Sequence, residues 1–88
     1  MFKIWAKLYK KEKIVGSIIF EHQEKFNRDK FFSYLTKICQ TLDIVVPVVM
    51  NSHIDHFINF NNCRFLARDF VDKINFTKLV LESIPIDK

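Results

Sequence analysis

The stretch from Phe2 to Phe20 constrains the fold of this chain more than any other. Phe2–Tyr9 alternates with a period of two and is rich in aromatic and branched residues, which is the pattern of a β-strand. A polar break, Lys10–Lys13, separates it from a second apolar run, Ile14–Phe20. The two runs predict a β-hairpin with Lys11 and Glu12 at its tip, although Lys-Glu is a poor sequence for a tight hairpin turn.

In the register that this tip implies, Trp5 lies opposite Ile18, and Lys3 lies opposite Phe20. A slip of one residue would move the second strand's side chains to the other face. In either register both faces of the hairpin carry apolar residues, whereas an ordinary half-buried hairpin has one polar face. We therefore expect a helix, a partner chain or a ligand to cover each face.

Length and composition predict a single domain, residues 1–88. Hydrophobic residues make up 49% of the chain and include ten phenylalanines, which is enough for a compact core. The formal net charge is +4. A mildly basic chain permits an acidic partner or a nucleic acid but requires neither.

The predicted compartment is the cytoplasm. Lys3 and Lys7 interrupt any apolar core of a signal peptide. No run reaches the ~20 apolar residues that a membrane-spanning helix needs, so we expect no membrane association. In that setting Cys39 and Cys63 are expected to be free thiols.

Two helices are expected after the hairpin. Apolar residues recur with helical spacing within Arg28–Leu42, and Asn27 is a plausible N-cap. A shorter helix is expected at Ser52–Phe60, with Ser52 and Asp55 in positions that resemble a capping box and with Asn61 at its end.

The last third of the chain predicts strands. Cys63–Ala67 is read as a short strand, Arg68–Lys73 as one helical turn, Phe76–Ile84 as a final strand and Pro85–Lys88 as a frayed tail. The resulting order, ββααββ, argues for an α+β fold with a mainly antiparallel sheet. An alternative has Val48–Met50 joining the sheet as well.

Metal binding is one functional hypothesis. His53 and His56 are three residues apart and would share a helix face, and Cys39 and Cys63 could complete a tetrahedral site. The tight Cys-x2-Cys element of strong zinc sites is missing, and the competing interpretation is two surface histidines and two core thiols. No phosphate-binding loop, nucleophile elbow or HExxH motif occurs, so we predict no catalytic residues and no cofactor.

Single-stranded nucleic acid is a second hypothesis. Lys3, Trp5, Lys7 and Tyr9 alternate charge with aromatic rings on one strand face, where bases can stack while lysines meet phosphate. Arg64, Arg68 and the lysines of the hairpin tip would extend this surface. The competing interpretation is that the rings belong to the core, with lysine stems over them.

Protein association is the leading hypothesis. A hairpin that is apolar on both faces, followed by one long and one short helix, leaves an apolar surface that a homodimer or another protein partner would cover. We predict a small non-enzymatic interaction module that uses the hairpin face carrying Lys3, Trp5, Lys7, Tyr9, Ile18 and Phe20.

Several segments together resemble a group of small uncharacterised bacterial proteins. They are the strand Ile4–Lys7, the helix Phe31–Leu42 with Ile44–Pro47 after it, and the later Phe65, Asp69–Phe70 and Phe76–Leu81. The resemblance implies one small cytoplasmic domain, and it implies no activity, cofactor or site.

Overall fold

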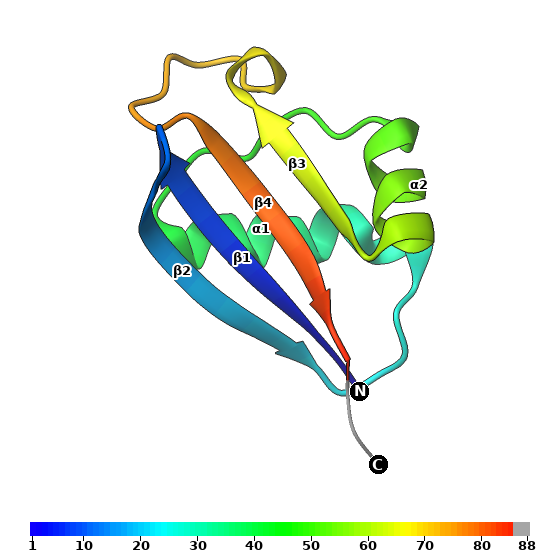
Figure 1. Cartoon of the computed structure of the whole chain (residues 1–88). Coiled ribbons are helices and arrows are strands. Elements are labelled where there is room, and N and C mark those ends of the chain that lie inside the picture. The colour runs from blue at the N-terminus through cyan, green and yellow to red at the C-terminus, as the bar shows by residue number, and fades with distance from the viewer. Residues whose placement is uncertain (86–88) are drawn as a thin grey trace.

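The computed structural model describes residues 1–85, which form one four-stranded antiparallel sheet and two α-helices (Figure 1). The elements, in chain order, are β1 (Phe2–Lys10), β2 (Lys13–His22), α1 (Phe31–Leu42), α2 (Asn51–Phe60), β3 (Asn62–Leu66) and β4 (Lys78–Ile84). In space the strands lie in the order β2-β1-β4-β3. The predicted α+β class and ββααββ order are therefore confirmed, and Val48–Met50 is a connection outside the sheet.

The first helix lies where its periodicity predicted it. A 3₁₀ turn, Arg28–Lys30, leads into α1, and the side chain of Asn27 accepts a hydrogen bond from the Asp29 N–H at 2.9 Å. Asp43 ends the helix in a left-handed conformation, with φ of 59°.

The second helix is also confirmed, but its predicted cap is wrong. The N-cap is Met50, and the ring of His53, three residues on, accepts a hydrogen bond from the Met50 N–H at 3.0 Å. Ser52 and Asp55 do not form the expected capping box. Asn61 ends α2 with a φ of 63°, a left-handed conformation that asparagine tolerates better than most residues.

The C-terminal third contains both predicted strands with shifted ends, but its helical turn is shorter than predicted and begins one residue earlier. The helical turn expected at Arg68–Lys73 is a 3₁₀ turn at Ala67–Asp69. In β4, Leu79 and Leu81 are buried, as their alternation predicted. Residues 86–88 of the predicted frayed tail lie outside the described residues.

Both helices contribute to one core on the same side of the sheet, and in Figure 1 α1 crosses behind the strands while α2 lies beside β3. The core lies between these two layers, and it includes Ile4 and Ala6 from β1, Phe65 from β3 and Leu35 from α1. Phe57 of α2 and Phe70 both belong to this same core. Neither segment therefore covers the opposite face of the sheet, the one that carries Trp5. Within residues 1–85, the helices are all too short or too polar to cross a membrane.

A β-bulge changes the register of the hairpin. The tip pairs as predicted, with Lys10 opposite Lys13 and Tyr9 opposite Ile14, but the next pair is Leu8 with Gly16. Val15 is thus an extra residue on β2.

The register predicted beyond the bulge is therefore wrong by one residue. Trp5 lies opposite Ile19 and Lys3 lies opposite Glu21. Ile18 and Phe20 consequently face the helices and pack partly buried against the core, and they are not on the Trp5 face. The physical reason is burial: the bulge turns two large apolar side chains toward the core.

Candidate functional site

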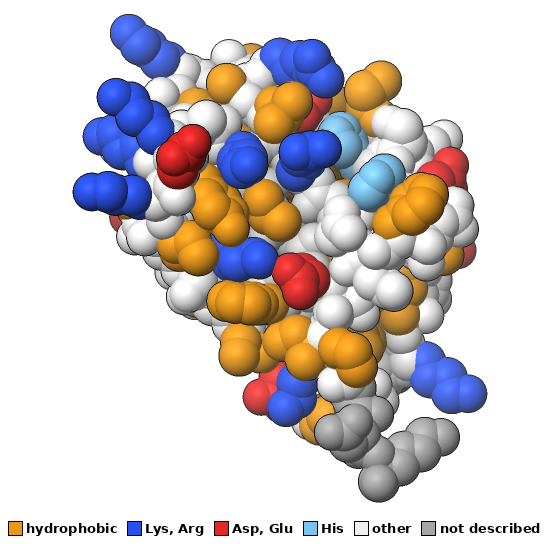
Figure 2. Space-filling view, viewed as in Figure 1, with side chains coloured by type: hydrophobic (Ala, Val, Ile, Leu, Met, Phe, Trp, Pro, Cys, Tyr) orange, Lys and Arg blue, Asp and Glu red, His pale blue; other side chains and the backbone are white. Residues whose placement is uncertain are grey.

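The sheet face opposite the helices, called here the open face, is left uncovered by the described residues (Figure 2). Alternation and register place on it the following side chains: Lys3, Trp5, Lys7 and Tyr9 from β1, Ile14, Ser17, Ile19 and Glu21 from β2, Lys78, Val80, Glu82 and Ile84 from β4, and Asn62, Arg64 and Leu66 from β3. Four of the six residues predicted for an interaction surface, Lys3, Trp5, Lys7 and Tyr9, share this face. Hydrophobic and basic side chains intermingle across it in Figure 2.

Exposed apolar side chains concentrate on one side of this face. Trp5, Ile14 and Ile19, called here the apolar patch, all belong to β1 and β2. Trp5 is 37% exposed and Ile19 is 58% exposed. A group of large apolar side chains left in water on neighbouring strands is typical of a binding surface.

The apolar patch borders an unpaired sheet edge. β2 is an outermost strand, and no other described strand pairs with its outer side. The opposite edge, β3, has five residues, half the ten of β2, and α2 packs against it. A long edge strand with exposed apolar side chains is a template for another extended chain.

The aromatic rings of β1 already have cationic neighbours. The Lys7 Nζ lies 4.3 Å from the Trp5 ring centroid and 2.9 Å from the Glu82 Oε1, and the Lys7 side chain is only 12% exposed. The Lys78 Nζ lies 4.9 Å from the Tyr9 ring centroid. Lys7 is therefore engaged within the protein, and the lysine ammonium groups occupy ring faces on which bases would stack.

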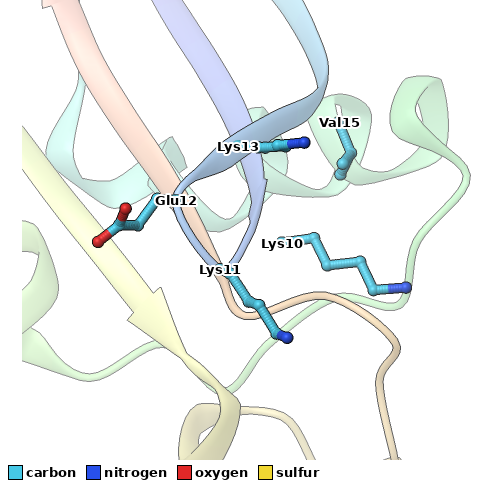
Figure 3. A pocket seen from close by; sticks show the side chains of 5 residues that line it. All are labelled: Lys10, Lys11, Glu12, Lys13 and Val15. Carbon is cyan, nitrogen blue, oxygen red and sulfur yellow. The ribbon is translucent and has the colours of Figure 1, made fainter.

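The tip of the hairpin forms a basic corner. Lys10, Lys11 and Lys13 line a shallow hollow together with Glu12 and Val15. In Figure 3 the Glu12 side chain points away from the side on which the Lys10, Lys13 and Val15 side chains lie. Within residues 1–85 none of these three lysines forms an ion pair, and they make this end of β2 positive.

Three of the four predicted metal ligands meet at a second hollow, which lies between α2, β3 and the 3₁₀ turn Ala67–Asp69. His53, His56 and Cys63 line it, whereas Cys39 is buried on the core side of α1 and does not. Among residues 1–85, no group of three or more His, Cys, Asp or Glu side chains is arranged to hold a metal ion. The metal hypothesis therefore has no geometric support.

The two histidines have different roles. His53 Nδ1 accepts from the Met50 N–H, and its Nε2 lies 3.6 Å from the Asp69 Oδ2, which itself accepts from the Leu66 N–H at 2.8 Å. The Nδ1 of His53 thus caps α2, and its Nε2 faces the segment after β3. His56 Nδ1 lies 2.7 Å from the Asn62 carbonyl oxygen, which can only accept, so Nδ1 carries a proton and Nε2 is free.

Both thiols are shielded from solvent. Burial raises the pKa of Cys39 to about 11 and that of Cys63 to about 12. At neutral pH each is therefore a neutral thiol, which is neither the nucleophile nor the metal-ligating form.

Thiol labelling of the folded protein will be slow as a consequence. With Ellman's reagent at pH 8, we expect little reaction in buffer and rapid reaction of both thiols in denaturing urea, because Cys39 and Cys63 must be exposed before they can ionise. Rapid labelling without urea would contradict the burial of these side chains.

Two features of this surface were missed from the sequence. Ile19 belongs to the apolar patch, and the signal that points to it is Gly16, since a lone glycine in a strand pattern often marks a bulge. Tertiary packing brings Arg64 and Arg68 next to α2 at the second hollow, and no local sequence pattern indicates this.

Comparison with protein-family models, curated proteins and solved structures found no match to this chain. The resemblance to small bacterial proteins stays a prediction. Function is therefore argued from the geometry of the open face and its neighbouring hollows.

Proposed function

We propose that this protein is a non-enzymatic interaction module that binds through its open face and the outer edge of β2. The observation that carries the proposal is the apolar patch lying along an unpaired ten-residue edge strand. An added strand would satisfy the free backbone groups of the edge, and its side chains would remove the patch from water. Burial contributes about 25 cal/mol per Å² of apolar surface.

The occupant that the charges favour is a second copy of this chain. β2 begins beside the basic tip, at Lys13, and the acidic Glu21 lies near its other end. When two β2 strands pair antiparallel, the basic end of each lies beside the acidic end of the other, and opposite charges on paired strands stabilise the pair. The result is a two-fold dimer with one continuous eight-stranded sheet, and closed two-fold dimers are the commonest homo-oligomers.

Molar mass as a function of concentration tests this proposal. By sedimentation or light scattering we expect the mass to rise to twice that of one chain as concentration increases, with a stronger rise at low salt because the paired strand ends carry opposite charges. A single-chain mass at every concentration up to the millimolar range would overturn the second copy as the occupant.

We further propose the cytoplasm as the compartment. The two cysteines are free in the structure, and free buried thiols are typical of reducing compartments.

Single-stranded nucleic acid is the second candidate, favoured by the basic tip next to Trp5 and Tyr9. Trp5 is the sole tryptophan and therefore reports on this surface. Because Lys7 is paired with Glu82 and covers the Trp5 ring, we expect titration with a single-stranded oligonucleotide at low salt to leave Trp5 emission unchanged. Saturable quenching that weakens with added salt would favour this candidate over protein association.

A further inference from the structure

The hollow between α2, β3 and the 3₁₀ turn Ala67–Asp69 has the dimensions and chemistry of a ligand site. Its volume is about 390 Å³, and ligand pockets span roughly 300–1,000 Å³. Its polar lining consists of Ser52, His53, His56, Arg64, Arg68 and Asp69. In Figure 2, histidine side chains lie next to basic side chains on this part of the surface.

The charges in this hollow are unbalanced. Neither Arg64 nor Arg68 has a carboxylate within ion-pair distance in the part of the chain that the structure describes. The one acidic side chain in the lining is Asp69, and its Oδ2 is engaged by the Leu66 N–H at 2.8 Å and faces His53 at 3.6 Å. Two guanidinium groups therefore border the hollow without a counter-charge in it that is free to pair with them.

Two further side chains can contact an anion there. His56 uses Nδ1 for the Asn62 carbonyl oxygen, which leaves Nε2 for a hydrogen bond with a phosphate oxygen. Ser52, in the first turn of α2, adds a hydroxyl donor. Guanidinium groups suit oxyanions because their fork of N–H donors matches two oxygens at once.

We propose that this hollow binds the phosphate group of a phosphate monoester, with Arg64 and Arg68 as its principal contacts. Two guanidinium groups match the charge of a phosphate monoester dianion better than that of a single carboxylate. The hollow is much larger than a phosphate ion, so its remaining volume accommodates part of the group that carries the phosphate. Cys63 and Leu66 give that volume an apolar wall. The proposal is independent of dimer formation, because it concerns the β3 side of the sheet and not the β2 edge.

Titration of the full chain with inorganic phosphate, phenyl phosphate and acetate tests this site, with amide chemical shifts or heat of binding as the readout. We expect phenyl phosphate to bind at least about tenfold more tightly than phosphate, because it also fills the volume beside the phosphate, and acetate to bind more weakly than either. Equal affinities for phenyl phosphate and phosphate would contradict the ester, and equal affinities for acetate and phosphate would reduce the site to an adventitious ion only.

Variants of the two arginines locate the binding. We expect Arg64→Ala and Arg68→Ala each to weaken phenyl phosphate binding roughly tenfold, as loss of a charge-assisted hydrogen bond predicts, and the double variant to abolish it. Arg28→Ala is the matched control, since Arg28 pairs with Asp55 and does not line the hollow. All of these arginines are exposed, so urea midpoints should stay unchanged and exclude misfolding. Wild-type affinity in the double variant would overturn the proposal.

Discussion

Replacing Phe65 by alanine will lower the free energy of unfolding by about 3–5 kcal/mol, the range typical of a fully buried phenylalanine. Phe65 is 0% exposed and comes from β3, the shortest strand of the sheet. Its ring lies 4.4 Å, centroid to centroid, from the ring of His53 in α2, and its backbone pairs opposite Leu79. The substitution therefore leaves a cavity where α2 and the sheet meet.

The expected loss is large relative to the whole stability. A chain of this length is expected to be stable by ~4–13 kcal/mol, so the variant will be partly unfolded in mild denaturant. Urea unfolding followed by circular dichroism measures the effect. Phe32→Ala is the matched control, because Phe32 is 58% exposed on α1 and its loss should change stability by less than ~0.5 kcal/mol. Similar losses in the two variants would show that Phe65 is not a core residue.

Replacing Ile19 by lysine will weaken self-association by roughly 100-fold. Burying an isoleucine contributes about 1.5 kcal/mol at the low end of its range, which suits a side chain that a paired strand covers in part, and a two-fold interface carries the substitution twice. Ile19 points outward on the open face, opposite Trp5, and is 58% exposed within one chain. The fold of a single chain should therefore tolerate the lysine. In the dimer, two lysines would replace apolar side chains on the surface along which the two β2 strands pair.

Val71→Lys provides the control for this experiment. Val71 is 86% exposed and lies outside the sheet, so the same added charge there should leave the mass distribution unchanged. Sedimentation equilibrium of both variants at matched salt separates a site-specific effect from a general effect of net charge. If both variants dissociated equally, charge repulsion alone would explain the result and the β2 edge would lose its role.

Local pattern was sufficient to predict most of the elements. The period-two alternation of β1 and the helical spacing of α1 are properties of neighbouring residues, and both elements lie where those patterns indicated. The end of α2 at Asn61 was likewise readable, because a left-handed residue at a helix end favours asparagine. The cap at the start of α2 could not be predicted, because the His53 ring that reaches the Met50 N–H lies against Phe65 and faces Asp69, which are distant in the sequence.

The candidate surface was predictable in part. Lys3, Trp5, Lys7 and Tyr9 share a strand face by alternation alone. The partner of Lys7 was beyond reach of any local pattern, because Glu82 is 75 residues further along the chain and arrives only when β4 pairs with β1. The sequence suggested Lys7 as a phosphate contact, but the ion pair with Glu82 holds this lysine within the sheet.

The amino-acid sequence by itself determined that a two-sided apolar hairpin would head an α+β domain, because strand and helix periods are set by covalent geometry. Only the tertiary structure decided which face remained open. Both helices pack on the side of Ile4 and Ala6, and the bulge at Val15 turns Ile18 and Phe20 toward them while leaving Ile19 beside Trp5. A one-residue shift costs little in local pairing, so the burial of whole side chains against α1 and the core determined the register.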